Sequence, residues 1–434
     1  MVRRLRTERR FCRVRGDSIL DRIDWTVVLT YFAMIFMGWI NIYAAVYDEE
    51  LASDMFSLAY NPGKQLIWIA TSIVLIIGVM SLDYKFFDSF AYIIYGAMIF
   101  LLIAVLLFGR EVAGSTSWFQ LGSFRFQPSE FTKFATALAL AKYLGDIHTK
   151  MENVKTQLIA VAIMFVPMAL IVLQGDTGSA MVFAAFAIVL FREGISPIYF
   201  IVGIGLVVLF VLTLLVSKTA IFIFSGVVCL VVIGASVKHP RRILVVVLVA
   251  FAIFSTVTSV DFLMKNVLKP HQRSRVISLI NPDADPLGAG WNVTQSKIAI
   301  GSGGFFGKGF LEGTQTKFDF VPEQSTDFIF CTLGEEHGWL GSLVMIGLFV
   351  FLLIRISIIA ERQKTRFARI YGYGVLSVIF FHFSVNIAMT IGLFPVIGIP
   401  LPFFSYGGSS LWSFTTLLFI LLALDSKRMQ VLTR

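Results

Sequence analysis

The chain has 434 residues, of which 57% are hydrophobic and only 15% are charged, and its mean hydropathy is +0.82. This composition excludes a soluble globular domain, in which charged residues make up about 25% of the chain. The net charge of +9 would suggest a nucleic-acid or anionic-lipid partner in a soluble protein, but the basic residues lie between apolar runs and near the chain ends. We therefore interpret the charge as a signal of membrane topology and expect no nucleic-acid partner.

The chain begins with an arginine-rich leader, residues 1–24, and the apolar run after it is longer than the core of a signal peptide, which has about 7 to 15 residues. We expect this run to be a retained first span. Later runs are also long enough to cross a hydrocarbon layer of about 30 Å. The sequence predicts an all-α fold, a polytopic transmembrane bundle of about 10–12 spans in one domain at 25–434. In chain order the predicted spans are 25–46, 65–82, 90–108, 129–144, 156–174, 177–191, 197–216, 220–236, 242–260, 328–354, 367–393 and 404–424.

The loops between these spans indicate the orientation, because Lys and Arg near span ends favour the cytoplasm. If the leader is inside, the C-terminus and several short basic segments also fall inside, namely those with Lys85, with Lys142, Lys150 and Lys155, with Arg192, with Lys238, Arg241 and Arg242, and with Arg355, Arg362, Lys364, Arg366 and Arg369. The acidic segment 48–54 falls outside. The sequence thus predicts a multi-pass plasma-membrane protein with both termini in the cytoplasm.

One outer loop, residues 261–328, is much longer than the others. Loops of this length in compact proteins are usually functional or disordered. We expect this one to be structured against the membrane domain, because it contains many aromatic residues: Trp291, Phe305, Phe306, Phe310, Phe318 and Phe320.

Asp327 lies where this loop enters the next span, directly after Ser325 and Thr326, which are natural helix-capping residues. One interpretation is structural: an aspartate in the first turn of a helix is stabilised by the helix dipole. The other is that Asp327 accepts a proton during a reaction.

Basic residues of the same loop are candidates for binding phosphate, since guanidinium and ammonium groups bind phosphate oxygens. They are Arg273, Arg275, Lys297 and Lys308. The alternative is that they meet lipid headgroups at the membrane surface. The glycines at 301–309 could let backbone N–H groups approach phosphate or sugar, but a structural turn is the simpler role. The segment is not a Walker A loop, because Gly309 follows Lys308 where Ser or Thr is required.

Other polar residues lie within or beside the predicted spans. Glu130 and Lys133 are one helical turn apart, so we expect them to pair, either to brace an outer cavity or to contact a substrate. Asp176 is either a functional residue or a helix cap. Glu335 and Glu336 lie about two turns inside their span, and we expect structural or gating roles for them. The segment 405–410, SYGGSS, favours close helix packing.

Several motifs, in order along the chain, resemble those of the SEDS family of cell-wall polymerases, which includes RodA, FtsW and SpoVE. They are FQPSEFTKF, QGDTGSA, QSKIAIGSGGFFGKG, GTQ, VPEQSTDFIF and IPLPFFSYGGSS. The lysine of QSKIA and the GTQ at 313–315 are more similar to the elongation branch than to the division branch. The resemblance covers nearly the whole chain, which departs from the family by an extra pair of spans within 197–260.

The resemblance implies a peptidoglycan glycosyltransferase of the bacterial inner membrane that polymerises lipid II into β-1,4-linked strands, for cell wall biogenesis and cell shape. It implies an inverting reaction with Asp327 as general base, and substrate binding by the basic residues above, by Gln315 and by Glu130 with Lys133. It also implies a class B penicillin-binding protein as partner, in contact with membrane lipid. The sequence indicates no obligatory cofactor and leaves room for a divalent cation, Mg or Mn.

Three alternatives remain open at this stage. The first is a transporter, which composition alone equally allows; specifically, a flippase for the lipid-linked precursor is the second hypothesis after the polymerase. Transporters usually place their sites near the membrane midplane, whereas the polar motifs here gather in one outer loop. A division-specific polymerase and a scaffold for a partner enzyme are the other two.

Overall fold

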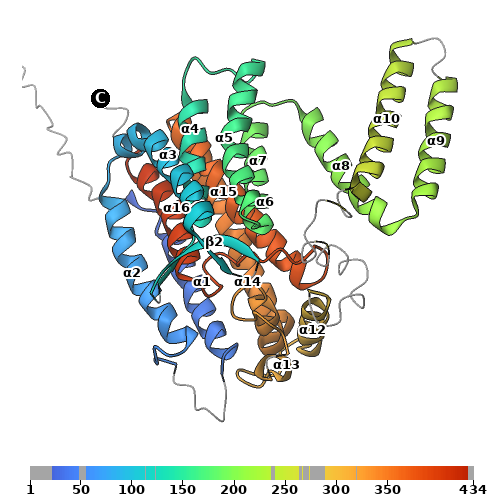
Figure 1. Ribbon diagram of the computed structural model, residues 1–434. Coiled ribbons are helices and arrows are strands. Elements are labelled where there is room, and N and C mark those ends of the chain that lie inside the picture. Colours follow the sequence, from blue (N-terminus) through green and yellow to red (C-terminus); the bar gives the residue numbers. More distant parts are fainter. Residues whose placement is uncertain are drawn as a thin grey trace, which may run out of the picture.

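A computed structural model describes residues 22–47, 55–112, 114–122, 124–235, 240–262, 266, 273, 289–318 and 320–428. The described chain is a bundle of long helices, and the all-α polytopic prediction is confirmed (Figure 1). The helices are α1 (Trp25–Ala44), α2 (Asn61–Ser81), α3 (Tyr84–Phe108), α4 (Pro128–Gly145), α5 (Val154–Leu173), α6 (Thr177–Val182), α7 (Ala187–Arg192), α8 (Pro197–Leu215), α9 (Lys218–Ala235), α10 (Pro240–Phe262), α12 (Ala289–Ser302), α13 (Thr314–Lys317), α14 (Ile329–Glu361), α15 (Arg366–Thr390) and α16 (Gly408–Ser426).

Nine of the described helices are long and apolar enough to cross a membrane: α1, α2, α3, α5, α9, α10, α14, α15 and α16. The other three predicted spans also form helices. The segment Thr177–Arg192 is shorter and is interrupted by a 3₁₀ turn, and α8 contributes a shorter apolar stretch. Helix α4 carries several buried polar residues, which lowers its hydropathy. The buried polar residues of α4 require cover by neighbouring helices rather than by lipid.

Helices α15 and α16 lie at the centre of the bundle. In α16, 83% of the most apolar window is buried inside the protein, against 17% in α3. Helix α4 packs extensively on α15, α3 and α16, and α14 packs on α15 and α1. The polar residues of α4 are therefore enclosed by other helices rather than by lipid.

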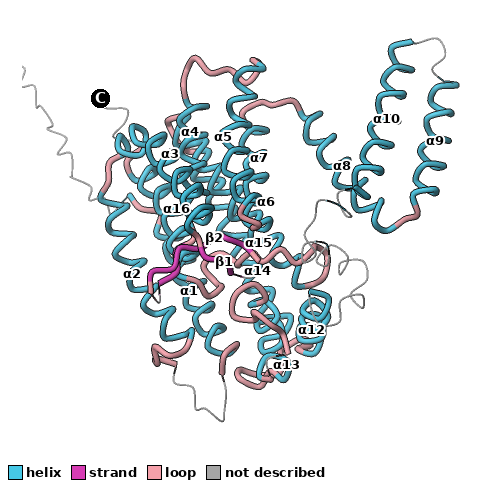
Figure 2. Tube along the Cα trace, in the orientation of Figure 1, coloured by secondary structure: helices cyan, strands magenta, loops and turns pink. Residues whose placement is uncertain are grey.

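A small antiparallel sheet joins α3 to α4, which the sequence analysis missed. Its strands are β1 (Arg110–Val112), β2 (Ser115–Leu121) and β3 (Phe124–Phe126), in the order β1-β2-β3 (Figure 2). The backbone N–H of Thr116 donates to the carbonyl of Gln174 at 2.9 Å, which ties the sheet to the end of α5.

Ion pairs between buried aspartates and half-buried arginines join three helix ends at one end of the bundle. Asp24, before α1, accepts from Arg355 of α14 at 2.6 Å and from Arg362 after α14 at 3.1 Å. Arg362 also pairs with Asp425 near the end of α16. The start of α1 and the ends of α14 and α16 therefore lie at one end, while α12 and α13 lie at the opposite end (Figure 1). This agrees with the prediction that the start of the first span and the C-terminus lie on the same side of the membrane. That this side is the cytoplasm stays a prediction.

Helices α8, α9 and α10 fill the region where the sequence predicts an extra pair of spans. Helix α10 packs on α8 and α9, and Figure 1 shows the three helices standing apart from the main bundle. None of the residues of α9 is buried. Their apolar surfaces are suited to contact with lipid.

Candidate active site

Asp327 does not lie in the first turn of a helix, so of the two interpretations the first-turn one was wrong. Helix α14 begins at Ile329, and its N-cap residue is Phe328. Residues before it form turns instead: the N–H groups of Thr326 and Phe328 both donate to the carbonyl of Glu323, at 3.1 and 3.2 Å. Glu323 permits this by adopting a left-handed conformation, with φ of 57°. Asp327 therefore precedes α14.

The backbone around Asp327 is held by residues from distant parts of the chain. Asn386 of α15 donates its side-chain N–H to the carbonyl of Asp327 at 2.8 Å and to that of Ile399 at 2.8 Å. Ser405 donates its hydroxyl to the carbonyl of Thr326 at 2.6 Å. Asp327 is thus fixed between α14, α15 and the loop that precedes α16.

The half-buried carboxylate of Asp327 faces Gly398. Gly398 has φ of +71°, and a Cβ atom built on it would lie 3.2 Å from Oδ2 of Asp327. Both the backbone conformation and the close approach favour glycine here. Asn386 and Gly398 were missed by the sequence analysis, although the motif IPLPFFSYGGSS lies just after Gly398.

The carboxylate of Glu335 accepts hydrogen bonds from the loop before Asp327. Its side chain has no exposed surface, and its carboxylate accepts from the N–H groups of Thr314, Gln315 and Thr316 at 2.8, 2.9 and 3.0 Å. The ammonium group of Lys308 donates to it at 2.6 Å. We call residues 308–316 the outer turn. The structural role expected for Glu335 is consistent with these contacts.

The glycine-rich segment packs into a break in α14, and the structural-turn interpretation fits these contacts. Gly338 interrupts α14 with φ of 63° and ψ of −155°. The N–H groups of Lys308 and Gly309 donate to the carbonyls of Glu335 and Glu336 at 3.0 and 3.1 Å. The N–H of Trp339 in turn donates to the carbonyl of Gly304 at 2.9 Å. These loop N–H groups already bond to α14, which weighs against a phosphate cradle.

The predicted phosphate-binding residues that the structure describes have different surroundings. Lys308 is bound to Glu335, whereas the exposed Lys297 of α12 lies beside Gly392 at the end of α15. Arg273 is exposed, and Arg275 lies outside the described residues. Gln315, half-buried, keeps its side-chain oxygen without a hydrogen-bond partner among the described residues.

Glu130 and Lys133 form the expected ion pair, at 2.8 Å, with side chains only 3% and 1% exposed. Nζ of Lys133 also lies 3.0 Å from Nε2 of His382. Nδ1 of His382 lies 3.0 Å from the carbonyl of Pro400, which can only accept, so Nδ1 is the donor and Nε2 accepts from Lys133. The three residues form a buried polar chain between α4 and α15, which braces the bundle. Substrate contact by Glu130 and Lys133 stays a prediction.

Asp176 caps α6: its carboxylate accepts from the N–H of Ser179 at 3.0 Å and from Gln127 at 3.0 Å. The SYGGSS segment packs closely, since a Cβ on Gly408 would lie 2.7 Å from the ring of Trp68. Among the described residues, no group of three or more His, Cys, Asp or Glu side chains could hold a metal ion.

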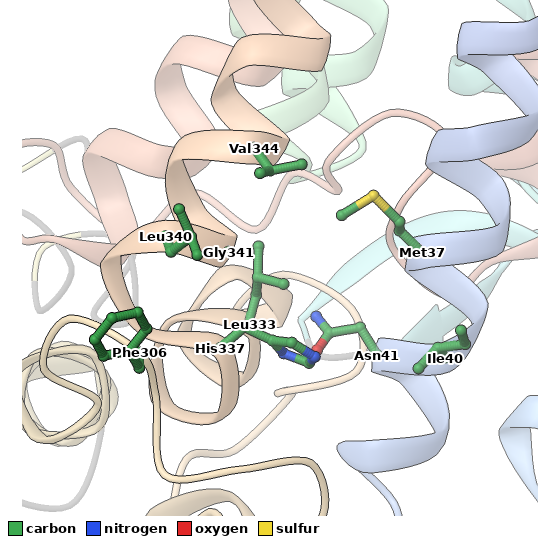
Figure 3. Close-up of a pocket in the computed structure, with 9 residues that line it drawn as sticks. All are labelled: Met37, Ile40, Asn41, Phe306, Leu333, His337, Leu340, Gly341 and Val344. Atoms are coloured by element: carbon green, nitrogen blue, oxygen red, sulfur yellow. The ribbon is translucent and has the colours of Figure 1, made fainter.

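A largely apolar pocket of about 370 Å³ lies between α1 and α14 (Figure 3). Its polar lining residues are Asn41 and His337, and the rest of the lining includes Met37, Leu333 and Val344. Asn41 donates to the carbonyl of Ile329 at 3.0 Å, so the pocket borders the start of α14.

Comparisons with known proteins agree with this architecture. The family model described as Cell cycle protein, covering FtsW, RodA and SpoVE, matches residues 24–220 and 216–430. The chain is 35% identical to the peptidoglycan glycosyltransferase RodA of Treponema pallidum, over 96% of this chain and 100% of that protein. It is 34% identical to the peptidoglycan glycosyltransferase MrdB of Escherichia coli, over 79% and 80%. A solved structure described as "Structural coordination of polymerization and crosslinking by a peptidoglycan synthase complex" superposes with a TM-score of 0.68 and 26% identity, over 94% of this chain and 99% of that one.

Proposed function

The chain belongs to the FtsW, RodA and SpoVE family, and from this premise we propose that it polymerises lipid II with Asp327 as the general base. It is a peptidoglycan glycosyltransferase, as its relatives from Treponema pallidum and Escherichia coli are named, and it acts in cell elongation. The observation that carries the proposal is the setting of Asp327. This carboxylate lies outside α14 and is half-buried, on a backbone held by Asn386 and Ser405.

This setting suits proton transfer. A sugar hydroxyl that attacks an anomeric carbon must lose its proton, and a fixed carboxylate within hydrogen-bond reach can accept it. The new bond joins the acceptor oxygen to the anomeric carbon as the bond from that carbon to the pyrophosphate breaks. The electron pair leaves with the lipid pyrophosphate. One displacement of this kind inverts the configuration at the anomeric carbon, which gives a β-1,4 linkage from an α-linked donor.

The pyrophosphate leaving group needs positive charge near it. We propose Lys308, Lys297, Arg273 and Arg275 for this role, with Gln315 as a neutral contact. Lys308 is bound to Glu335, but Glu335 also accepts three backbone N–H bonds. Lys308 can therefore turn from Glu335 to a phosphate without leaving a buried carboxylate unpaired, a state that is costly.

We also propose that a divalent cation, Mg²⁺ or Mn²⁺, is bound together with the pyrophosphate rather than by a protein site of its own. Mg²⁺ is usually held by one or two carboxylates plus substrate phosphates. Calorimetric titration of the substrate-free protein with Mn²⁺ should then detect no tight site. A tight stoichiometric site would contradict the proposal.

A class B penicillin-binding protein is the proposed partner. The support is the similarity to a solved structure whose description couples polymerisation with crosslinking in a synthase complex. We expect the cognate partner to co-purify with this chain and to raise its rate of polymerisation. An unchanged rate at saturating partner would remove the activation.

The function is tested by incubating the purified protein with lipid II and separating the products by gel electrophoresis. We expect glycan strands longer than the disaccharide. A lipid flippase or a scaffold makes no glycan, so the absence of glycan would contradict the proposal. The bacterial inner membrane, with both termini in the cytoplasm, is the proposed location.

A further inference from the structure

Glu335 is a buried carboxylate within a membrane-spanning helix. It lies about two turns into α14, with no exposed surface, and it carries out no step in the chemistry proposed above. Burying a carboxylate costs several kcal/mol unless strong partners satisfy it. A purely apolar residue would pack at this position without that cost, so the partners of Glu335 indicate what its charge is for.

Most of those partners are backbone groups of the outer turn. Three consecutive N–H groups, of Thr314, Gln315 and Thr316, point at the two carboxylate oxygens at 2.8–3.0 Å. The hydroxyl of Thr314 adds a longer contact at 3.2 Å. Lys308 donates as well and is the only charged partner of Glu335 among the described residues. Its side chain is 26% exposed, so water can also solvate its ammonium group. Glu335 therefore does more than neutralise one lysine, because it orders the backbone of the outer turn.

Asp327 lies two residues before Ile329, the first residue of the same helix. Glu335 follows Asp327 by eight positions, and the α14 backbone between them is buried and continuous up to Gly338. A rigid helix segment thus connects the proposed base to the anchor of the outer turn, which bears Lys308 and Gln315. The neighbouring Glu336 adds a weaker bond, from the N–H of Leu311 at 3.2 Å.

We propose that Glu335 is a positioning residue, which fixes Lys308 and Gln315 of the outer turn relative to Asp327 during glycan polymerisation. This inference rests on the proposed function. Its physical basis is that reacting groups must be held within a fraction of an ångström, since a misplacement of about 1 Å can cost roughly 100-fold in rate.

The first test replaces Glu335 with Gln. The amide keeps the size, but its NH₂ group faces backbone N–H donors and cannot accept from them. We expect faster hydrogen exchange at 314–316 and a fall in kcat/KM for lipid II of about 10- to 100-fold, measured per folded molecule well below the Tm. Glu312→Gln is the matched control, because Glu312 is an exposed carboxylate of the same turn.

A second variant covers the case in which Glu335→Gln does not fold. Thr314→Pro leaves Glu335 in place but removes one N–H and one hydroxyl donor. Gly313 is already extended, with φ of −67° and ψ of 123°, as a residue before proline prefers to be, so little strain is added. We expect a smaller loss of kcat/KM than for Glu335→Gln.

The outcomes separate this inference from the proposed function. If exchange at 314–316 rises but kcat/KM per folded molecule stays within twofold of wild type, Glu335 only stabilises the fold and the positioning role is wrong. Unchanged exchange would also overturn it. If wild-type protein makes no glycan at all while exchange still depends on Glu335, the proposed function fails and the contact itself stands.

Discussion

At the scale of single residues, the space around Asp327 depends on the absence of a side chain at position 398. Gly398 has a left-handed backbone, with φ of +71°, and a Cβ atom on it would lie 3.2 Å from Oδ2 of Asp327. A side chain at this position would both strain the backbone and push on Oδ2. The two effects can be separated with a second glycine of similar conformation.

We predict that Gly398→Ala lowers polymerisation markedly, because the new methyl group would displace the proposed base. The backbone strain alone costs about 1 kcal/mol. Gly122→Ala is the control: Gly122 has φ of +63°, but a Cβ there would meet no atom within 4 Å. The two variants should lose similar stability in thermal unfolding, while only Gly398→Ala loses activity. Equal activities would show that the contact with Asp327 is not needed.

The sequence predicted a contact between two residues only where the two lie close together in the chain. Glu130 and Lys133 are one helical turn apart, and their pairing is confirmed. His382 was not predicted, because it lies 249 positions from Lys133 and nothing in local spacing links the two. Asn386 and Gly398 were missed for the same reason. The first-turn placement of Asp327 was wrong because Glu323, rather than a capping side chain, organises the residues before α14.

At the scale of elements, α14 and the glycine-rich segment depend on each other. The break at Gly338 leaves backbone groups of α14 without helical partners, and residues 304–309 supply them. A Cβ on Gly307 would lie 2.0 Å from the carbonyl oxygen of Glu336, a distance that real atoms do not adopt. Glycine is therefore required at this point of contact.

We predict that Gly307→Ala forces the segment away from α14, because neither backbone can yield without losing hydrogen bonds. The variant should unfold at a lower temperature and expose the segment to protease. Gly301→Ala serves as control, since a Cβ there meets no atom within 4 Å and alanine favours helix over glycine by about 1 kcal/mol. A Gly307→Ala protein as stable and protease-resistant as the Gly301→Ala protein would contradict the packing described.

Elements were predicted well where hydropathy alone decides them. All twelve predicted apolar runs correspond to helices among the described residues. The sheet before α4 was missed because β1 and β3 have only three residues each, too few to show an alternating pattern. The sequence of the glycine-rich segment allowed either a phosphate or sugar contact or a structural turn. The hydrogen bonds between this segment and α14 favour the structural turn.

At the scale of the whole molecule, the ion pairs among Asp24, Arg355, Arg362 and Asp425 mark one end of the bundle. The outer turn and the start of α14 lie at the other end (Figure 1). Arg355 and Arg362 lie at the first end, and Lys and Arg near span ends favour the cytoplasm. The proposed site then faces the outside, where a lipid-linked precursor would be polymerised.

We predict that the connection between α9 and α10 is cytoplasmic and that the outer turn is external. Single cysteines at His239, which lies outside the described residues, and at the exposed Glu312 test this in a variant without native cysteines. A membrane-impermeant maleimide added to intact cells should label position 312 and spare position 239. Labelling of 239 but not 312 would invert the topology and place the site on the wrong side.

The central claim, that Asp327 is the general base, is tested most directly by Asp327→Asn in purified protein. Asn keeps the size of the side chain but cannot take a proton, and a general base contributes about 10² to 10⁴ in rate. We predict that glycan synthesis falls by this factor while the Tm and the affinity for lipid II stay near those of wild type and of Glu312→Gln. Near-normal synthesis by a stable Asp327→Asn protein would contradict the account and remove Asp327 from the mechanism.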